Sequence, residues 1–240
     1  MSRVFVAAPL ESGARVRLAG SAAGHLTRVL RLRPGARLTL FNGTGGEYSG
    51  TLEAIGRGAV TVAVGEAHPV ERESPLEVTL AQGISRGERM DLIVQKATEL
   101  GVSRIVPVFS ARSVVRLDNR QAERRLEHWR AIAIGACEQS GRNRPPQLSL
   151  PRTVAELLHE DRSSTRVLLS PSAATRLAQL PPPQGAVLVL VGPEGGLAPQ
   201  EAEQALAAGF VAVRLGPRVL RTETAAIAAL ALLQQDFGDL

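Results

Sequence analysis

Apolar and polar residues alternate in short stretches through residues 1–70, and a period of two predicts β-strands. These stretches are RVFVA, ARVRLA, ARLTLFN, GEYSGTLEAI and GAVTVAVGEA, and glycine-rich turns separate them. One helical pattern, SAAGHLTRVLRLRPG, interrupts the series. Several short strands at regular spacing indicate a small antiparallel barrel or sandwich.

From Leu76 onward the pattern changes to strands that alternate with helices. The expected strands are LEVTLAQGI, RIVPVF, TRVLLS, AVLVLVG and FVAVRLG. The expected helices cover residues 90–100, 119–140, 154–160, 199–208 and 222–235. This alternation predicts an α/β domain with a mostly parallel sheet. The charged, proline-bounded segment HPVERESP is the expected linker, so we predict one domain over residues 1–72 and a second over 73–240.

Two of the expected strands end in unusual turns. AVLVLV, apolar at consecutive positions as in a strand covered on both faces, runs into GPEGGLAPQE. There Gly192, Gly195 and Gly196 lack a Cβ, so a ligand has access to the backbone, and Pro193 stiffens the turn. The next strand of the chain ends in LGPRVLRTETA, which leads into a helix that we expect Thr222 to cap.

Ligands of open α/β sheets collect outside the carboxyl ends of the strands, which makes both corners candidate binding loops. Neither corner contains the phosphate-loop pattern GxxxxGK[ST] or the dinucleotide pattern GxGxxG. Glu201 and Glu203 at the start of the following helix would repel a phosphate. The corners therefore favour a ligand that is recognised by backbone groups, although each corner alone is also compatible with a simple strand-to-helix connection.

A third stretch, HWRAIAIGACEQSGRNRPPQLSLP, covers residues 128–151. Helical spacing places Trp129, Ile132, Ala136 and Cys137 in a hydrophobic core. Polar side chains then crowd before a double proline: Glu138, Gln139, Ser140, Arg142, Asn143 and Arg144. Two interpretations stay open, a polar helix end on the surface or a cluster that offers donors and an acceptor to the edge of a nucleobase.

Composition restricts the class of protein further. A chain of 240 residues that is 44% hydrophobic has a sizeable core, and its longest apolar run, residues 225–233, is too short to cross a bilayer. We therefore expect no membrane association and a cytoplasmic location. One cysteine and four scattered histidines predict neither a disulfide nor a metal site.

The net charge of +5 is unevenly distributed along the chain. Residues 1–72 contain nine arginines against five acidic residues, whereas the remainder of the chain is close to neutral. A basic lobe joined to a neutral one is typical of a protein that binds a phosphate backbone with one part and acts with another. A solvated basic surface is the alternative.

Five stretches together resemble a known family: HLTRVLRLRPG, QKATELGVSRIVPV, HWRAIAIGACEQSGRNRPP, VGPEGGLAPQE and LGPRVLRTETA. In this order and at about these spacings they are similar to the RsmE family of ribosomal RNA methyltransferases. The resemblance spans the whole chain. It implies an N-terminal PUA-like β-barrel that binds RNA, followed by a SPOUT α/β domain whose C-terminal segment forms a trefoil knot, and a homodimer.

The resemblance also implies a reaction and a set of contacts. S-adenosylmethionine would donate a methyl group to N3 of one uridine near the 3′ end of the 16S ribosomal RNA, in the small ribosomal subunit. The residues implied to hold the donor are Leu169, Val191, Gly192, Glu194, Gly196, Leu215, Gly216, Leu220 and Thr222. Those implied to bind RNA are Arg3, His25, Arg28, Arg31, Arg33, Arg86 and Lys96.

The expected chemistry needs an acceptor for the N3 proton of uracil or a group that stabilises the resulting anion. Because the motifs contain no well-placed histidine, a carboxylate is favoured, with Glu138 and Glu223 ranked above Glu194. Arg142 and Arg221 are the candidate guanidinium groups for the uracil oxygens or a neighbouring phosphate. Each of these side chains could instead form an ion pair that fixes a loop.

Two other functions are compatible with the same residues. A noncatalytic RNA-binding assembly factor would use the glycine corners only as connections. A nucleotide-hydrolysing enzyme would use GPEGG as a phosphate loop. Titration with S-adenosylmethionine and with ATP distinguishes them, since only the methyltransferase binds the first and ignores the second.

Overall fold

The computed structural model describes residues 2–113, 115, 117–161 and 163–240, and it divides the chain into two compact units. The first unit comprises Met1–Glu73 and Cys137–Pro145, and the second comprises Ser74–Ala136 and Pro146–Leu240. A single boundary along the chain does not describe this division, because residues 137–145 return to the N-terminal unit.

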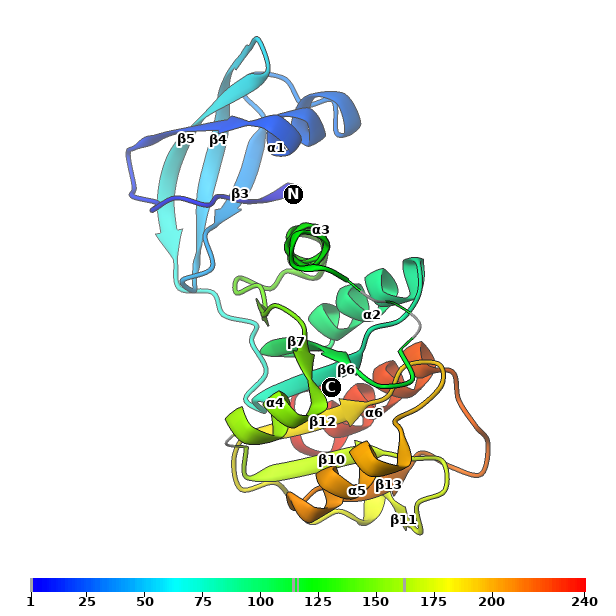
Figure 1. The fold of residues 1–240 in the computed structure, drawn as a ribbon. Helices are drawn as coiled ribbons and strands as arrows, with labels where there is room; N and C mark the ends of the chain where they lie inside the picture. Colours follow the sequence, from blue (N-terminus) through cyan, green and yellow to red (C-terminus); the bar gives the residue numbers. More distant parts are fainter. Residues whose placement is uncertain (1, 114, 116, 162) are drawn as a thin grey trace. The chain divides into compact units, whose positions relative to one another are not determined.

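The first unit is built on one curled five-stranded sheet (Figure 1). Its strands are β1 (Ser2–Phe5), β2 (Arg15–Ala19), β3 (Arg37–Phe41), β4 (Glu47–Gly56) and β5 (Ala59–His68). They lie in the order β1-β3-β4-β5-β2, and the short helical segments α1 (Gly20–Gly24) and η1 (His25–Val29) follow β2. The expectation of a purely antiparallel sheet is wrong at one edge, since β1 pairs with β3 in parallel. Contacts between segments distant in sequence decide that direction, which the alternation within each strand does not encode.

The second unit contains one parallel sheet of eight strands. They are β6 (Val78–Gly83), β7 (Arg104–Phe109), β8 (Gln147–Leu148), β9 (Arg152–Thr153), β10 (Thr165–Leu169), β11 (Thr175–Arg176), β12 (Val187–Val191) and β13 (Val211–Arg214). The order is β11-β13-β10-β12-β6-β7-β8, and β9 pairs with β7. The five longer strands are those expected from the sequence; the two-residue strands are too short to give a periodic signal. Strand β10 separates β12 from β13, so the two glycine corners do not follow adjacent strands.

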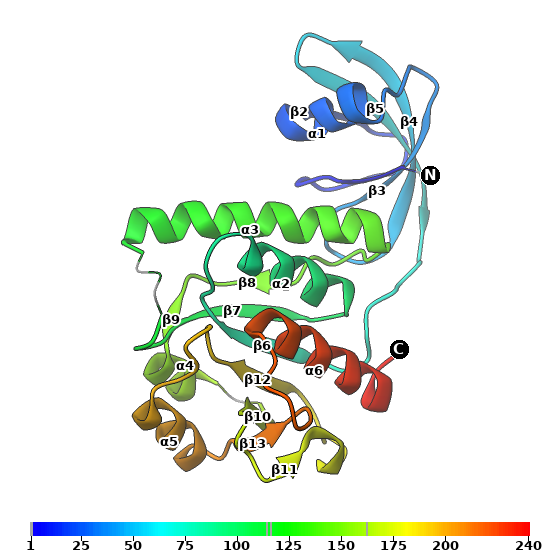
Figure 2. The same ribbon diagram turned by 90° about the vertical axis from the view of Figure 1, so that its right-hand side faces the viewer.

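Helices cover both faces of this sheet, as the continuous apolar run of β12 predicts. They are α2 (Glu88–Glu99), α3 (Asn119–Ser140), α4 (Val154–Glu160), α5 (Pro199–Ala207) and α6 (Thr222–Phe237), with one turn η2 (Leu177–Gln179). In Figure 2, α2 and α6 lie side by side on one face, and α4 and α5 lie on the other.

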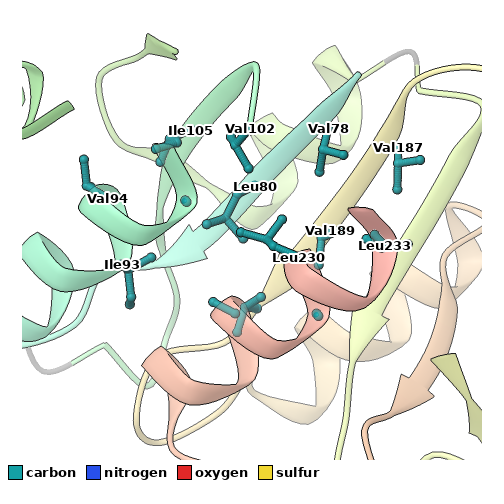
Figure 3. Close-up of a cluster of buried hydrophobic side chains, with 14 of the residues drawn as sticks. Val78, Leu80, Ile93, Val94, Val102, Ile105, Val187, Val189, Leu230 and Leu233 are labelled. Carbon is teal, nitrogen blue, oxygen red and sulfur yellow. The ribbon is translucent and has the colours of Figure 1, made fainter. Parts of the chain in front are cut away.

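Alternate residues of β12 supply the two cores. Val187, Val189 and Val191 pack with α2 and α6, and Figure 3 shows the first two beside Leu230 and Leu233 of α6. Leu188 and Leu190 belong to the core under α4 and α5. A strand buried on both faces is thereby fixed in register, which holds the turn after Val191 in place. Among the described residues, no helix is both long enough and apolar enough to cross a bilayer.

A pocket at the strand ends of the second unit

The carboxyl ends of β10, β12 and β13 open into a pocket of about 690 Å³. Its walls come from residues 168–171, 191–197, 213–216 and 218–223, with Ala202 and Ala225 from the adjoining helices and two arginines, Arg89 and Arg112. All nine residues expected to hold the donor line this pocket, as do Arg221 and Glu223. The two glycine corners therefore meet at one cavity even though a strand separates them in the sheet.

The corner after β12 folds back on itself. The amide of Gly196 donates to the carbonyl of Pro193 at 2.8 Å. A Cβ on Gly192 would lie 2.9 Å from the backbone carbon of Gly196 and from the nitrogen of Leu197, so only glycine allows this return. Gly196, by contrast, has a φ of +68° and open space where a side chain would begin. The sequence predicted that each glycine admits a ligand, but Gly192 is needed first for the turn itself.

Thr222 links the second corner to the first. The expectation that it caps α6 is wrong, since the helix begins at Thr222 and the capping position belongs to Arg221, which makes no side-chain cap. The Thr222 hydroxyl instead donates to the carbonyl oxygen of Gly192 at 2.7 Å. It is buried, and the hydrogen bond connects segments 30 residues apart. The hydroxyl is thus used between the two corners rather than within its own helix.

Two carboxylates at the pocket are held differently. Glu194 accepts hydrogen bonds from the Arg86 amide at 3.0 Å and from Arg89 Nη1 at 2.9 Å. Burial opposes its ionisation, but these donors outweigh it and keep the pKa of Glu194 below its ordinary value. Glu223 has one oxygen, Oε1, 3.9 Å from Arg89 Nε. Its other oxygen, Oε2, is buried and has no hydrogen-bond partner in the described part of the chain.

Four of the five arginines that line this pocket were not predicted from the sequence as site residues. Five arginines contribute to the lining, of which only Arg221 was expected: Arg89, Arg112, Arg214, Arg218 and Arg221. The signal for Arg214 and Arg218 was available, because Arg214 ends β13 and Arg218 lies in the corner after it, which was already suspected. For Arg89 and Arg112 there was none, since they come from segments about 80 or more residues earlier in the chain. Ser170 and Pro171, after β10, were missed as well.

The start of α5 does not provide a phosphate site. The Glu201 carboxylate accepts from the Ala198 amide at 2.8 Å, from the Ala111 amide at 2.8 Å and from the Ser110 hydroxyl at 2.8 Å. A carboxylate therefore already occupies the helix end at which an anion would otherwise bind. This arrangement argues against the interpretation of GPEGG as a phosphate loop.

The polar cluster at the end of α3 lies in the first unit, where its side chains bind other parts of that unit. The Glu138 carboxylate accepts from the Phe5 amide at 3.0 Å, and burial raises the pKa of Glu138 despite that hydrogen bond. Arg142, 4% exposed, forms an ion pair with Glu73 in which its Nε lies 3.0 Å from Oε2. Asn143 is buried, accepts from Arg3 at 2.6 Å and donates to the Val70 carbonyl at 2.6 Å.

These contacts agree with neither earlier interpretation of the cluster in full. Arg142 and Asn143 are buried rather than part of a polar surface, and the hydrogen bonds of Glu138 to Phe5 and of Asn143 to Val70 lie within their own unit. The core residues expected from the same helix are found as predicted, with Trp129, Ala136 and Cys137 buried and Ile132 partly buried.

Replacing Arg142 with alanine is expected to destabilise the protein. The change leaves the Glu73 carboxylate without its guanidinium in a largely buried position, which costs about 3 kcal/mol. Urea denaturation followed by circular dichroism measures this difference. Arg144→Ala is the matched control, because the Arg144–Glu71 pair is solvent-exposed and contributes less than about 1 kcal/mol. Unchanged stability of Arg142→Ala together with lost activity would instead place Arg142 at the substrate.

Comparison with known proteins settles the family. Residues 72–234 match the family model of the RNA methyltransferase domain, and residues 18–65 match that of the RNA methyltransferase PUA domain. The chain is 33% identical to the ribosomal RNA small subunit methyltransferase E of Buchnera aphidicola subsp. Schizaphis graminum, over 99% of this chain and 97% of that protein. The chain belongs to the ribosomal RNA small subunit methyltransferase E family.

Two solved structures resemble this methyltransferase over almost its full length. The family member from Neisseria gonorrhoeae, bound to S-adenosylmethionine, is 41% identical with a TM-score of 0.92, covering 100% of this chain and 99% of that one. A methyltransferase from Legionella pneumophila, in complex with the same cofactor, is 39% identical with a TM-score of 0.96, covering 99% and 98%. The expected family and enzyme class are thereby confirmed, and both of these relatives contain the expected methyl donor.

The residues of the methyltransferase that were expected to bind RNA fall into two groups. Four of them are exposed on the α1–η1 segment and the loop that follows it, within the part that matches a PUA domain: His25, Arg28, Arg31 and Arg33. Arg31 has a φ of +52°, which is unusual for a residue with a side chain. This segment presents its basic groups to solvent.

The other three expected RNA-binding residues have partners within the protein. Arg3 forms an ion pair with Glu47 at 2.5 Å and lies over the ring of Phe41, and only 12% of its side chain is exposed. Lys96 forms an ion pair with Glu99 on α2. Arg86 is exposed, and its backbone amide donates a hydrogen bond to Glu194. In the described residues, no three histidine, cysteine or acidic side chains gather in a group that could hold a metal ion.

Proposed function

We propose that this methyltransferase transfers a methyl group from S-adenosylmethionine, held in the pocket of the second unit, to N3 of one uridine near the 3′ end of 16S ribosomal RNA. The observation that carries the proposal is the Glu223 carboxylate in the wall of that pocket, whose buried oxygen Oε2 has no hydrogen-bond partner among the described residues. Its substrate, the small ribosomal subunit, implies a cytoplasmic enzyme. When bound, the donor supplies an electrophilic methyl group on a positively charged sulfur.

The residues of the pocket fit this donor. A volume of about 690 Å³ lies within the usual range of roughly 300–1,000 Å³ for sites of small molecules and cofactors. Leu169, Val191, Leu215 and Leu220 provide apolar walls for an adenine ring, and the side-chain-free turn around Gly196 exposes backbone groups. The helix start that could have bound a phosphate is occupied by Glu201. The pocket therefore suits a ligand without phosphates.

Glu223 is the best candidate for the group that accepts the N3 proton. The N3–H group of uracil is a weak acid that stays protonated near neutral pH, so methylation requires that the proton be removed or the anion be stabilised. Glu194 is already held by Arg86 and Arg89, and Glu138 belongs to the first unit, where it accepts from Phe5. We assign the proton to the Glu223 carboxylate, because its oxygen Oε2 accepts no hydrogen bond from another group in the described part of the chain.

Arg221 is the candidate for stabilising the uracil oxygens. It is exposed at the pocket, directly before Glu223's helix, and has no ion-pair partner among the described residues. A guanidinium group donates up to five hydrogen bonds in a fixed plane, which matches a carbonyl oxygen that gains negative charge as the N3 proton leaves. We propose that Arg142 acts only through the fold of the first unit, because Glu73 already binds it.

The experiment that tests this function uses small ribosomal subunits from a strain that lacks the modification. The protein is incubated with these subunits and labelled S-adenosylmethionine, and the modified nucleotide is mapped by reverse transcription. A methyl group on N3 blocks the pairing edge of uracil, so a stop at one uridine near the 3′ end is expected. Label on a different nucleotide, or none, would overturn the proposal. Calorimetric titration with ATP is the control and should show no binding.

Family resemblance also supports two finer proposals about architecture, a trefoil knot in the C-terminal part and a homodimer. Exposed Leu92 on α2 and Leu232 on α6 add apolar surface on the helices that cover one face of the sheet. Sedimentation equilibrium of the full chain would test the dimer, and a monomer at micromolar concentration would refute it.

RNA binding by the full-length protein is expected to depend on salt through the basic α1–η1 segment. Each phosphate contact contributes about 0.7 to 0.9 to the slope of log K against log salt concentration. The triple change of Arg28, Arg31 and Arg33 to alanine should therefore reduce the slope by about 2. Filter binding of small-subunit RNA at several salt concentrations measures it. Arg15→Ala, which removes an arginine already paired with Glu53, is the control and should leave the slope unchanged.

A further inference from the structure

A fully buried glutamine lies behind the two corners of the pocket. Gln82 is the next-to-last residue of β6 and has 0% of its surface exposed. Its side-chain nitrogen Nε2 donates to the Gly83 carbonyl at 2.9 Å and to the Thr222 hydroxyl at 2.9 Å. Thr222 in turn donates to the Gly192 carbonyl at 2.7 Å. A chain of hydrogen bonds thus runs from the end of β6 through the start of α6 to the corner after β12.

The direction of this chain is fixed by its members. The Gly192 and Gly83 carbonyls can only accept, so the single hydroxyl proton of Thr222 is committed to Gly192 and Thr222 must accept from Gln82. Both N–H groups of the Gln82 amide are then used. The opposite orientation of the amide would set its oxygen against two acceptors. Gln82 therefore holds the Thr222 hydroxyl in the rotamer that binds the other corner.

Packing alone does not explain an amide at this position. The other polar atom, Gln82 Oε1, is buried without a hydrogen-bond partner in the described residues, which is unfavourable. Methionine or leucine would fill the same space without that cost. Loss of the amide would leave neither the Gly83 carbonyl nor the Thr222 hydroxyl without a hydrogen bond, since Gly83 also accepts from the Ser85 hydroxyl and Thr222 can still donate to Gly192.

We propose that Gln82 is a positioning residue that sets the spacing of the two corners through Thr222 and thereby the affinity for the methyl donor. The inference rests on the proposed function, in that it takes the pocket to be the donor site. Strand β10 separates β12 from β13 in the sheet, so no direct strand pairing holds their corners together. A site that is already arranged for its ligand binds more tightly than one that must be ordered on binding.

The test compares donor affinity with stability in the full-length protein. Gln82→Met is expected to weaken S-adenosylmethionine binding about tenfold by calorimetry, the size of one lost hydrogen bond, while the unfolding midpoint stays equal or rises. In steady-state assays the KM for the donor should rise while kcat at saturating donor changes little. Thr222→Ser, which keeps the hydroxyl, should retain affinity, whereas Thr222→Val should lose it.

Gln234→Met is the matched control. Gln234 is another buried glutamine of the same unit, bonded to Ser74 and the Leu100 carbonyl and outside the pocket lining. This variant should lower stability and leave donor affinity unchanged. Equal donor affinity in wild type and Gln82→Met, or loss of stability with no loss of affinity, would overturn the inference. Should Gln82→Met not fold, equal affinity in Thr222→Ser and Thr222→Val would overturn it. Absence of binding to the wild type would instead refute the proposed function.

Discussion

Replacing Glu223 with glutamine is expected to lower the rate of methyl transfer about 10²- to 10⁴-fold, the usual contribution of a positioned acid or base. The amide has nearly the same shape as the carboxylate but cannot accept the N3 proton. Glu223 Oε2 makes no hydrogen bond to another described residue, so changing this atom breaks no hydrogen bond that stabilises the fold. Single-turnover assays on small ribosomal subunits at saturating donor measure the rate of the chemical step.

Two further variants separate this role from a general effect of charge. Glu203→Gln removes an exposed carboxylate from α5 and should leave the rate unchanged. Glu194→Gln replaces the charged acceptor for Arg86 and Arg89 with a neutral amide oxygen and removes the ion pair with Arg89. It should act mainly on the shape of the first corner, raising the KM for the methyl donor more than it lowers the single-turnover rate. A Glu223→Gln enzyme with wild-type single-turnover kinetics would remove Glu223 from the reaction.

Replacing Gly192 with alanine is expected to weaken donor binding at least tenfold and to lower methyl transfer on the order of 10²-fold. The added Cβ would lie 2.9 Å from two backbone atoms of residues 196 and 197, closer than such atoms approach in proteins. Backbone cannot rotate away as a flexible side chain can, so the corner must open. Opening it also moves the Gly192 carbonyl away from the Thr222 hydroxyl. Calorimetry with S-adenosylmethionine reports the first effect, and single-turnover kinetics the second.

Gly135→Ala is the matched control for that substitution. Gly135 lies inside α3 with open space where a Cβ would be, so alanine there should stabilise the helix by about 1 kcal/mol and leave donor affinity unchanged. Donor affinity that is the same in Gly192→Ala and the wild type would mean that the turn tolerates displacement and that its closure is unimportant for binding.

The elements of this fold were predictable because their signals are local. The alternation in residues 1–70 indicated all five strands of the first sheet, and the apolar run of β12 indicated burial on both faces. Expected helix ends differ from the observed ones by at most two residues. Glycine and proline marked both corners of the pocket, since a turn that folds back closely excludes a Cβ.

The sequence by itself thus determined the longer strands, the longer helices and two of the loops that line the pocket. Only the tertiary structure decided that β1 runs parallel to β3, that β10 lies between the strands of the two corners, and that the cluster at residues 138–144 binds within the first unit. It also decided that the Thr222 hydroxyl donates to the Gly192 carbonyl and accepts from the Gln82 side chain. The physical reason is sequence separation: Gln82 and Thr222 are 140 residues apart, and local periodicity carries no information on which distant donor meets which acceptor.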